Sequence, residues 1–304
     1  MKLENEKGMI YISIASLTSA MLGLFVKLSA VNMSIPFLVL VRFLVPLFIC
    51  FPVFWYLGTF KKVLHEQTIK GSHLKGHLLR AVFLILSQYC YFFYLTKSSL
   101  LNAVMLLNTA PIFIPIVSKY LFKDKTIKVV SKSIVISLIG VILVIQPDQT
   151  LFMYSSLIGL LSGVFLAFSQ SIFGENVQER GMDENIFFVF WTSSIITLAV
   201  LMVFFSDHLK LGVFQLTHQT SREWLYILLI GICTTLNQYF RGVAYTHVKP
   251  HFLAPLMNLA VLFAFLFDLF VFKKTPDYLS IVGSLMIVLG TTLKWNTLRK
   301  QKKR

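Results

Sequence analysis

Long apolar runs separated by short polar segments extend along the whole chain. A helix that crosses a lipid bilayer needs roughly 20 mainly apolar residues. The connections between the runs are short, apart from a basic loop over 58–77 and a polar one over 206–223. The pattern predicts an all-α polytopic membrane protein with ten transmembrane helices, at 9–29, 35–57, 78–97, 101–121, 129–146, 153–174, 185–205, 224–246, 250–272 and 278–295.

A repeat relates the two halves of the chain. When the sequence is shifted by 150 residues, fourteen positions between 78 and 143 are identical to their counterparts, without a gap. Gln88 aligns with Gln238, and Asn108 aligns with Asn258. Self-similarity at one fixed offset indicates a duplication.

An odd number of helices in each copy sets the relation between the copies. Five helices in the first repeat, 1–147, deliver the chain to the opposite side of the membrane. The second repeat, 148–304, therefore has inverted topology. Inverted repeats are typical of transporters whose two halves rock around a site near the middle of the membrane.

Composition and charge agree with a membrane protein. The chain is 56% hydrophobic and 13% charged, whereas soluble domains are about 45–50% apolar and about a quarter charged. Most of the 28 Lys and Arg residues, including Arg80 beside the basic loop, fall on one side if the N-terminus is cytoplasmic. Positive loops mark the cytoplasmic side, so we expect both termini there. The net charge of +15 is then explained by positive cytoplasmic loops and does not require a nucleic-acid ligand. We therefore expect no nucleic-acid partner.

Matching stretches at 101–124 and 252–274 run from small residues through a proline to a Phe-containing end. With the Arg42-Phe43 pair, they resemble the EamA-type ten-helix branch of the drug/metabolite transporter superfamily. In that family the stretch usually ends in an acid; Asp124 keeps it, and Lys274 replaces it in the second copy. The resemblance implies a carrier of small organic molecules in a bacterial inner membrane. Branches of the family move amino acids, nucleotide sugars, vitamins or S-adenosylmethionine.

Arg241 is the leading candidate for a substrate-binding residue. An ionisable side chain inside a membrane span is costly and therefore a functional candidate. Helical spacing places Asn237, Arg241 and Tyr245 on one stripe of the span over 224–246. This stripe offers an amide, a cation and a phenol, which together suit a carboxylate or a phosphate.

Aromatic and amide side chains supply the other candidates. Tyr91 and Tyr94 lie on one stripe of the span over 78–97 and would pack on the body of a ligand. Buried amides demand hydrogen-bond partners. We therefore add the two aligned amide pairs, Gln88 with Gln238 and Asn108 with Asn258.

Acids and histidines are scarce within the predicted spans. Asp268 and His247 remain as candidates for carrying a proton. We expect His65, His73 and His77, in or beside the basic loop, to face solvent or lipid headgroups.

Motifs of soluble enzymes are missing from the sequence. It contains no GxxxxGK[ST], HExxH or GxSxG motif. Cys50, Cys90 and Cys233 lie in separate apolar runs. We expect no catalytic residue, no metal and no cofactor.

The sequence favours a carrier for a small polar metabolite that is amino-acid-like or otherwise anionic or zwitterionic. It would work by alternating access, with Arg241 holding the anionic group. A nucleoside-like or vitamin importer, for example of S-adenosylmethionine, is an alternative that would stack its ligand on Tyr91. A membrane enzyme or a lipid flippase is an alternative of another class. The expected partners are a small-molecule substrate and membrane lipid; the choice between monomer and homodimer, the direction of transport and the coupling ion stay open.

Overall fold

A computed structural model shows an all-helical protein within the part of the chain that it describes. Those residues are 2–56, 58, 72–122, 132–145, 154–204, 207, 221–273 and ten positions between 278 and 293. The helices are α1 (Lys2–Ser29), α2 (Ile35–Tyr56), α4 (Ser72–Lys97), α5 (Leu100–Leu107), α6 (Ala110–Leu121), α7 (Lys132–Ile145), α8 (Tyr154–Arg180), α9 (Met182–Phe204), α11 (Ser221–His247), α12 (Pro250–Met257) and α13 (Leu259–Phe270).

Seven stretches of these helices are long and apolar enough to cross a membrane. They are α1, α2, α4, α5 with α6, α8, α9, and α12 with α13. The 27-residue α11 is not among them, since Asn237, Gln238 and Arg241 lower its hydropathy. Helix α7 has 14 residues. The predicted tenth helix, 278–295, lies mostly outside the described residues.

Two of the predicted helices are each divided in two at an asparagine. The span predicted over 101–121 breaks at Asn108, and the span over 250–272 breaks at the equivalent Asn258. The Asn108 side chain donates to the carbonyl of Val104 at 2.6 Å, in competition with the helical ladder. Pro111 then occupies the first turn of α6, where its missing N–H group is tolerated.

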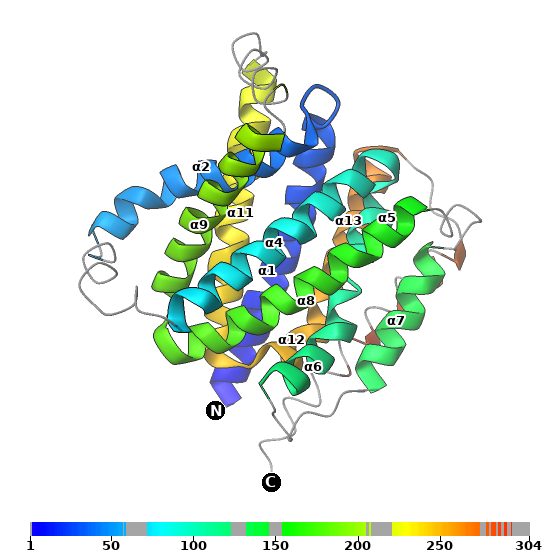
Figure 1. Ribbon diagram of the computed structural model, residues 1–304. Coiled ribbons are helices and arrows are strands. Elements are labelled where there is room, and N and C mark those ends of the chain that lie inside the picture. Colours follow the sequence, from blue (N-terminus) through cyan, green and yellow to red (C-terminus); the bar gives the residue numbers. More distant parts are fainter. Residues whose placement is uncertain are drawn as a thin grey trace.

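Helices from the two halves pair with each other in a repeated pattern. Helix α1 packs on α11, as its counterpart α8 packs on α4, and α2 packs on its own counterpart α9. Figure 1 shows that α1 and α4 run upward whereas α8 and α11 run downward. This opposite sense is what an inverted repeat requires.

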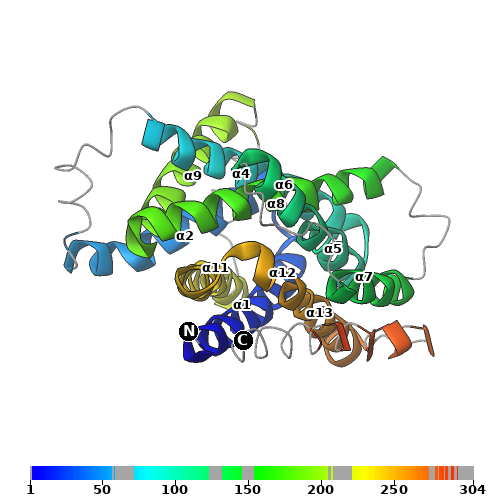
Figure 2. The same cartoon turned by 90° about the horizontal axis from the view of Figure 1, so that it is seen from below.

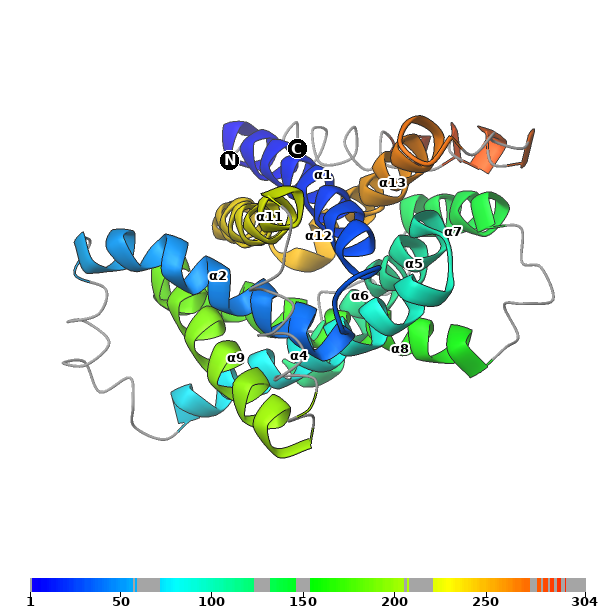
Figure 3. The same ribbon diagram turned by 90° about the horizontal axis from the view of Figure 1, so that it is seen from above.

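The helices lie in two layers when the bundle is viewed along its length. Helices α1, α11, α12 and α13 lie on one side, and α2, α4, α8 and α9 lie on the other (Figures 2 and 3). Large apolar side chains such as Phe48, Trp55 and Phe204 are exposed on the outside, as lipid-facing residues are. Polar side chains of the two layers meet inside the bundle, where Arg80 of α4 donates a hydrogen bond to Gln238 of α11.

Candidate functional site

Three arginine side chains are buried inside the bundle. Arg42 of α2, Arg80 of α4 and Arg241 of α11 are 5%, 1% and 5% exposed. We call them the arginine cluster. Arg42 and Arg80 each interact electrostatically with Arg241, as like charges. Because burial of a charge is costly unless it is paired, the surroundings of these three groups define the site.

Arg42 contacts side chains from α2 and α4. Its Nη1 atom donates a hydrogen bond to Oε1 of Gln88. The guanidinium lies 5.9 Å from the ring centroid of Phe43 and 5.8 Å from that of Phe92. Ring faces attract cations, but they supply no countercharge.

Arg80 bridges α4 to the second half of the chain. Its Nη1 atom donates to the carbonyl of Asn185 at 2.9 Å, and Nη2 donates to Oε1 of Gln238 at 3.0 Å. The guanidinium lies 3.5 Å from the ring centroid of Phe173. The two aligned glutamines, Gln88 and Gln238, therefore each accept a hydrogen bond from a different arginine.

None of the three guanidiniums forms an ion pair with a carboxylate among the described residues. The Nε atom of each is buried without a hydrogen-bond partner. Asp268 of α13 is the one described acid that is buried, and it interacts electrostatically with Tyr91, as Arg42 does. Among the buried side chains, three positive charges therefore stand against one negative charge, an excess of +2; Glu184, which is 18% exposed, is outside this count.

Two tyrosines complete the surroundings of the cluster. The hydroxyl of Tyr245 donates to Oε1 of Gln170 at 2.9 Å, and Tyr245 interacts electrostatically with Arg241 and Arg80. The hydroxyl of Tyr91 is buried and has no hydrogen-bond partner among the described residues. The cluster thus adjoins one phenol whose hydroxyl is engaged and another whose hydroxyl is available.

The structure brings together five of the nine candidate residues from the sequence. Arg241, Gln88, Tyr91, Gln238 and Tyr245 all belong to or contact the arginine cluster. The remaining four lie in other surroundings.

Two of the remaining four candidates make contacts between helices. Asn237 donates to the carbonyl of Ala15 of α1 at 2.7 Å. Tyr94 is buried against Gly159 of α8. Asn108 bonds within its own helix. Asn258 immediately precedes α13, and its Oδ1 atom is buried without a partner.

Arg80 and His77 also belong to the polar interior, although neither was predicted from the sequence as a site residue. Helix α4 begins at Ser72, six residues before the predicted span, and both side chains are buried. The expectation that His77 faces solvent or headgroups is therefore wrong. The spacing of Arg80, Ser87 and Tyr91, seven and four residues apart, places them on one helical face and was the available signal.

A cavity of about 630 Å³ lies elsewhere, beside the connection between α1 and α2. Met33, Tyr89 and Phe93 are among its mostly apolar lining residues, and none of the three arginines lines it. Substrate sites need convergent polar groups. We therefore assign the candidate site to the arginine cluster and not to this cavity.

Comparisons with known proteins agree on one kind of molecule. The EamA-like transporter family model matches residues 6–146 and again residues 153–294. The chain is 26% identical to the pseudopaline exporter of Pseudomonas aeruginosa strain UCBPP-PA14 over 218 residues, which cover 70% of this chain and 72% of that protein.

Similar proteins are also found in other organisms. An uncharacterized transporter of Helicobacter pylori strain J99 is 27% identical over 230 residues, which cover 75% of each chain. Human solute carrier family 35 member G1 is 25% identical over 207 residues, or 65% of this chain and 55% of that protein.

The fold has been seen in a crystal structure. One solved protein superposes with a TM-score of 0.67 at 13% identity, over 99% of this chain and 98% of that chain. The two family matches together span most of the sequence. The chain is therefore a membrane transporter that belongs to the EamA-like transporter family, within the drug/metabolite transporter superfamily.

Proposed function

We propose that this transporter carries a small metabolite with two anionic groups, such as a dicarboxylate or a phosphorylated acid. The observation that carries the proposal is the arginine cluster, whose three buried guanidiniums have no carboxylate partner among the described residues. Arg42 and Arg80 belong to helices of one layer, α2 and α4, and Arg241 belongs to α11 of the other layer. A ligand that contacts all three would therefore lie between the two layers.

Charge balance favours a dianion over a zwitterion. A zwitterionic amino acid brings no net charge and would leave the net charge of +2 uncompensated. A dianion neutralises it, and charge-assisted hydrogen bonds to guanidinium are about twice as strong as neutral ones. The amino-acid-like substrate of the sequence hypothesis is thereby narrowed to acidic compounds.

Arg241 is the primary anchor in this proposal. It interacts electrostatically with both Arg42 and Arg80, so an anion bound to it reduces both repulsions. Its Nε atom has no partner among the described residues. Gln88 and Gln238 then orient the other two arginines toward the same ligand.

The test is a thermal-unfolding screen of the purified protein at constant ionic strength. The probes are succinate, citrate, glutamate, alanine and adenosine. A ligand at 100 times its dissociation constant stabilises the folded state by about 2.7 kcal/mol. We expect succinate or citrate to raise the midpoint Tm, and alanine to leave it unchanged.

Two variants of α11 make the screen specific. Arg241→Gln should abolish the shift. Arg222→Gln, which removes an exposed arginine of the same helix, should retain it. A shift with alanine that depends on Arg241 would indicate a zwitterionic substrate. A shift with adenosine that Tyr91→Ala removes would support the nucleoside alternative, and the absence of any shift would favour a lipid substrate.

A further inference from the structure

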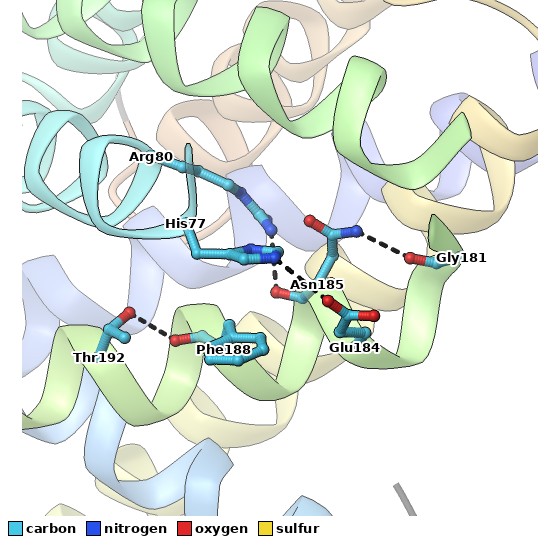
Figure 4. Close-up of polar contacts among 7 residues, drawn as sticks. All are labelled: His77, Arg80, Gly181, Glu184, Asn185, Phe188 and Thr192. Carbon is cyan, nitrogen blue, oxygen red and sulfur yellow. Dashed lines mark hydrogen bonds and ion pairs between the residues drawn. The ribbon is translucent and has the colours of Figure 1, made fainter. Parts of the chain in front are cut away.

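A histidine near the start of α4 and a glutamate near the start of α9 form a contact across the two halves. Both helices begin toward the end of the bundle where the N-terminus lies (Figure 1). Nε2 of His77 lies 3.4 Å from Oε1 of Glu184, and the two side chains are 1% and 18% exposed. The imidazole lies flat over Phe188, with ring centroids 4.4 Å apart and an angle of 14° between the planes. Figure 4 shows both contacts.

This contact joins α4 of the first half to the first turn of α9 in the second half. One helical turn along α4, Arg80 donates to the carbonyl of Asn185, the residue after Glu184 (Figure 4). Arg80 also donates to Gln238. The pair of His77 and Glu184 is therefore directly adjacent to the arginine cluster.

Several charged side chains lie on the elements around His77. Helix α4 itself carries Lys75 and Arg80. Of the helices packed against it, α9 contributes Asp183 and Glu184, α8 contributes Glu175 and Glu179, and α2 contributes Arg42. Helix α11, which Arg80 reaches through Gln238, carries Arg241. Glu184 is the group whose contact with the imidazole is observed. Lys75, Asp183 and Glu179 are exposed to solvent.

We propose that His77 and Glu184 form a proton-binding site and that the proton is carried together with the anionic substrate. Imidazole is the side chain that ordinarily changes charge between pH 5 and 8. A protonated His77 attracts the Glu184 carboxylate and holds α4 against α9. A neutral His77 removes that attraction, and this end of the bundle is released.

Coupling to the substrate follows from the position of Arg80. A proton on His77 adds positive charge one turn from the arginine cluster, so it strengthens anion binding there. Linkage is reciprocal, and a bound anion therefore favours protonation of His77. This step rests on the proposed function, whereas proton control of the α4–α9 contact does not.

His247 and Asp268, the proton carriers expected from the sequence, lie in different surroundings. His247 stacks on Tyr11 at a centroid distance of 6.3 Å. Asp268 accepts a hydrogen bond from the backbone N–H of Leu101, at the start of α5, at 2.9 Å. A carboxylate at a helix N-terminus accepts from backbone N–H groups that have no partner within the helix, which suits a fixed link between α13 and α5.

The experiment measures the opening of this end as a function of pH. Spin labels are placed at Tyr56 of α2, which packs with α9, and at Lys119 of α6, which packs with α8; both positions are exposed. The three native cysteines are replaced by alanine. Distance distributions are recorded in lipid nanodiscs by double electron–electron resonance at about pH 5.5 and about pH 8, which bracket imidazole titration.

We expect a single short distance at the lower pH and a longer population at the higher pH. In His77→Gln the longer population should be present at both values, so that the pH dependence is lost. Glu184→Gln should lose it as well while keeping the histidine. His247→Gln, the matched control, should behave as the unmodified protein does.

The proposal is overturned if the distances do not respond to pH, or if the response survives in His77→Gln. The labels report without any substrate. The anion screen described above is performed at one pH. Failure of the proton site and failure of the anionic-substrate assignment are therefore separate results.

Discussion

Gln88 is a neutral side chain that accepts a hydrogen bond from the buried cation of Arg42. A substitution can replace it with a charged acceptor of similar size. In Gln88→Glu, a carboxylate would face Arg42 in a region with net positive charge. We expect the ligand-free protein to gain stability by about 1.5–3 kcal/mol, the range for hydrogen bonds to charged groups. Anion binding should weaken about tenfold, because the new carboxylate competes with the ligand for Arg42.

Thermal unfolding with and without succinate or citrate measures both effects. Gln88→Leu is the matched variant, since it removes the acceptor and adds no charge, and it should lower Tm. A lower Tm for Gln88→Glu than for Gln88→Leu would contradict the expectation that a carboxylate beside Arg42 stabilises the ligand-free protein.

Substitution of Tyr91 can distinguish a role of its hydroxyl from a role of its aromatic ring. Its hydroxyl is buried without a partner among the described residues, and an unsatisfied polar group costs about 1–3 kcal/mol. We expect Tyr91→Phe to raise Tm slightly in the absence of ligand, and to weaken anion binding if the hydroxyl contacts the ligand. Equal binding by both proteins, measured by the ligand-induced Tm shift, would limit Tyr91 to packing.

At the scale of helices, glycines set how closely α8 approaches α5 and α6. A Cβ atom on Gly163 would lie 2.6 Å from the carbonyl oxygen of Leu106 and 2.1 Å from Oγ1 of Thr109. The backbone of α5 cannot yield as the end of a flexible side chain can. These contacts agree with close packing through small residues, as membrane helices often show.

Gly163→Ala should therefore destabilise the protein by about 1–3 kcal/mol, the usual cost of overpacking. Gly76→Ala in α4 is the control, because its nearest neighbour would lie 3.6 Å away in ordinary contact. Alanine is favoured over glycine in a helix by about 1 kcal/mol, so the control should be neutral or stabilising. Thermal unfolding of both variants in the same detergent is the measurement. Equal Tm values for the two variants would contradict the close approach of α8 to α5 at Gly163.

In the whole molecule, contacts between the two halves occur at both ends of the bundle. His77 and Glu184 meet at one end. Asp268 accepts from Leu101 of the first half at the other. The proposed alternating access would require the two ends to open in turn, and we expect that motion to break these two contacts.

Orientation in the membrane is a further prediction at this scale. The distribution of Lys and Arg predicts that both termini are cytoplasmic. Val31, 82% exposed between α1 and α2, would then face outward, whereas Lys119 would face inward. In a background without native cysteines, a membrane-impermeant maleimide should label Val31→Cys in intact cells. It should label Lys119→Cys after permeabilisation, and the reverse pattern would invert the topology.

The sequence by itself determined the class of fold and its internal duplication. Apolar runs long enough to cross a membrane must be helices there, because lipid offers no partner for backbone polar groups. The offset of 150 residues predicted which helices correspond, and the aligned pair Gln88 and Gln238 proved to have equivalent partners. Arg241 was recognisable because a charge in the middle of an apolar span is conspicuous.

Only the tertiary structure decided what surrounds Arg241. Arg42 and Arg80 lie in helices far apart in the sequence, and helical spacing within one element carries no information about which faces of different helices meet. Arg80 and His77 were obscured because α4 begins within the basic loop, where polarity resembles that of a solvated segment. The breaks at Asn108 and Asn258 were hidden for the opposite reason, because apolar residues continue on both sides. Which charged side chains are buried depends on how the helices pack. The net charge of the site therefore follows from the tertiary structure and not from any one helix.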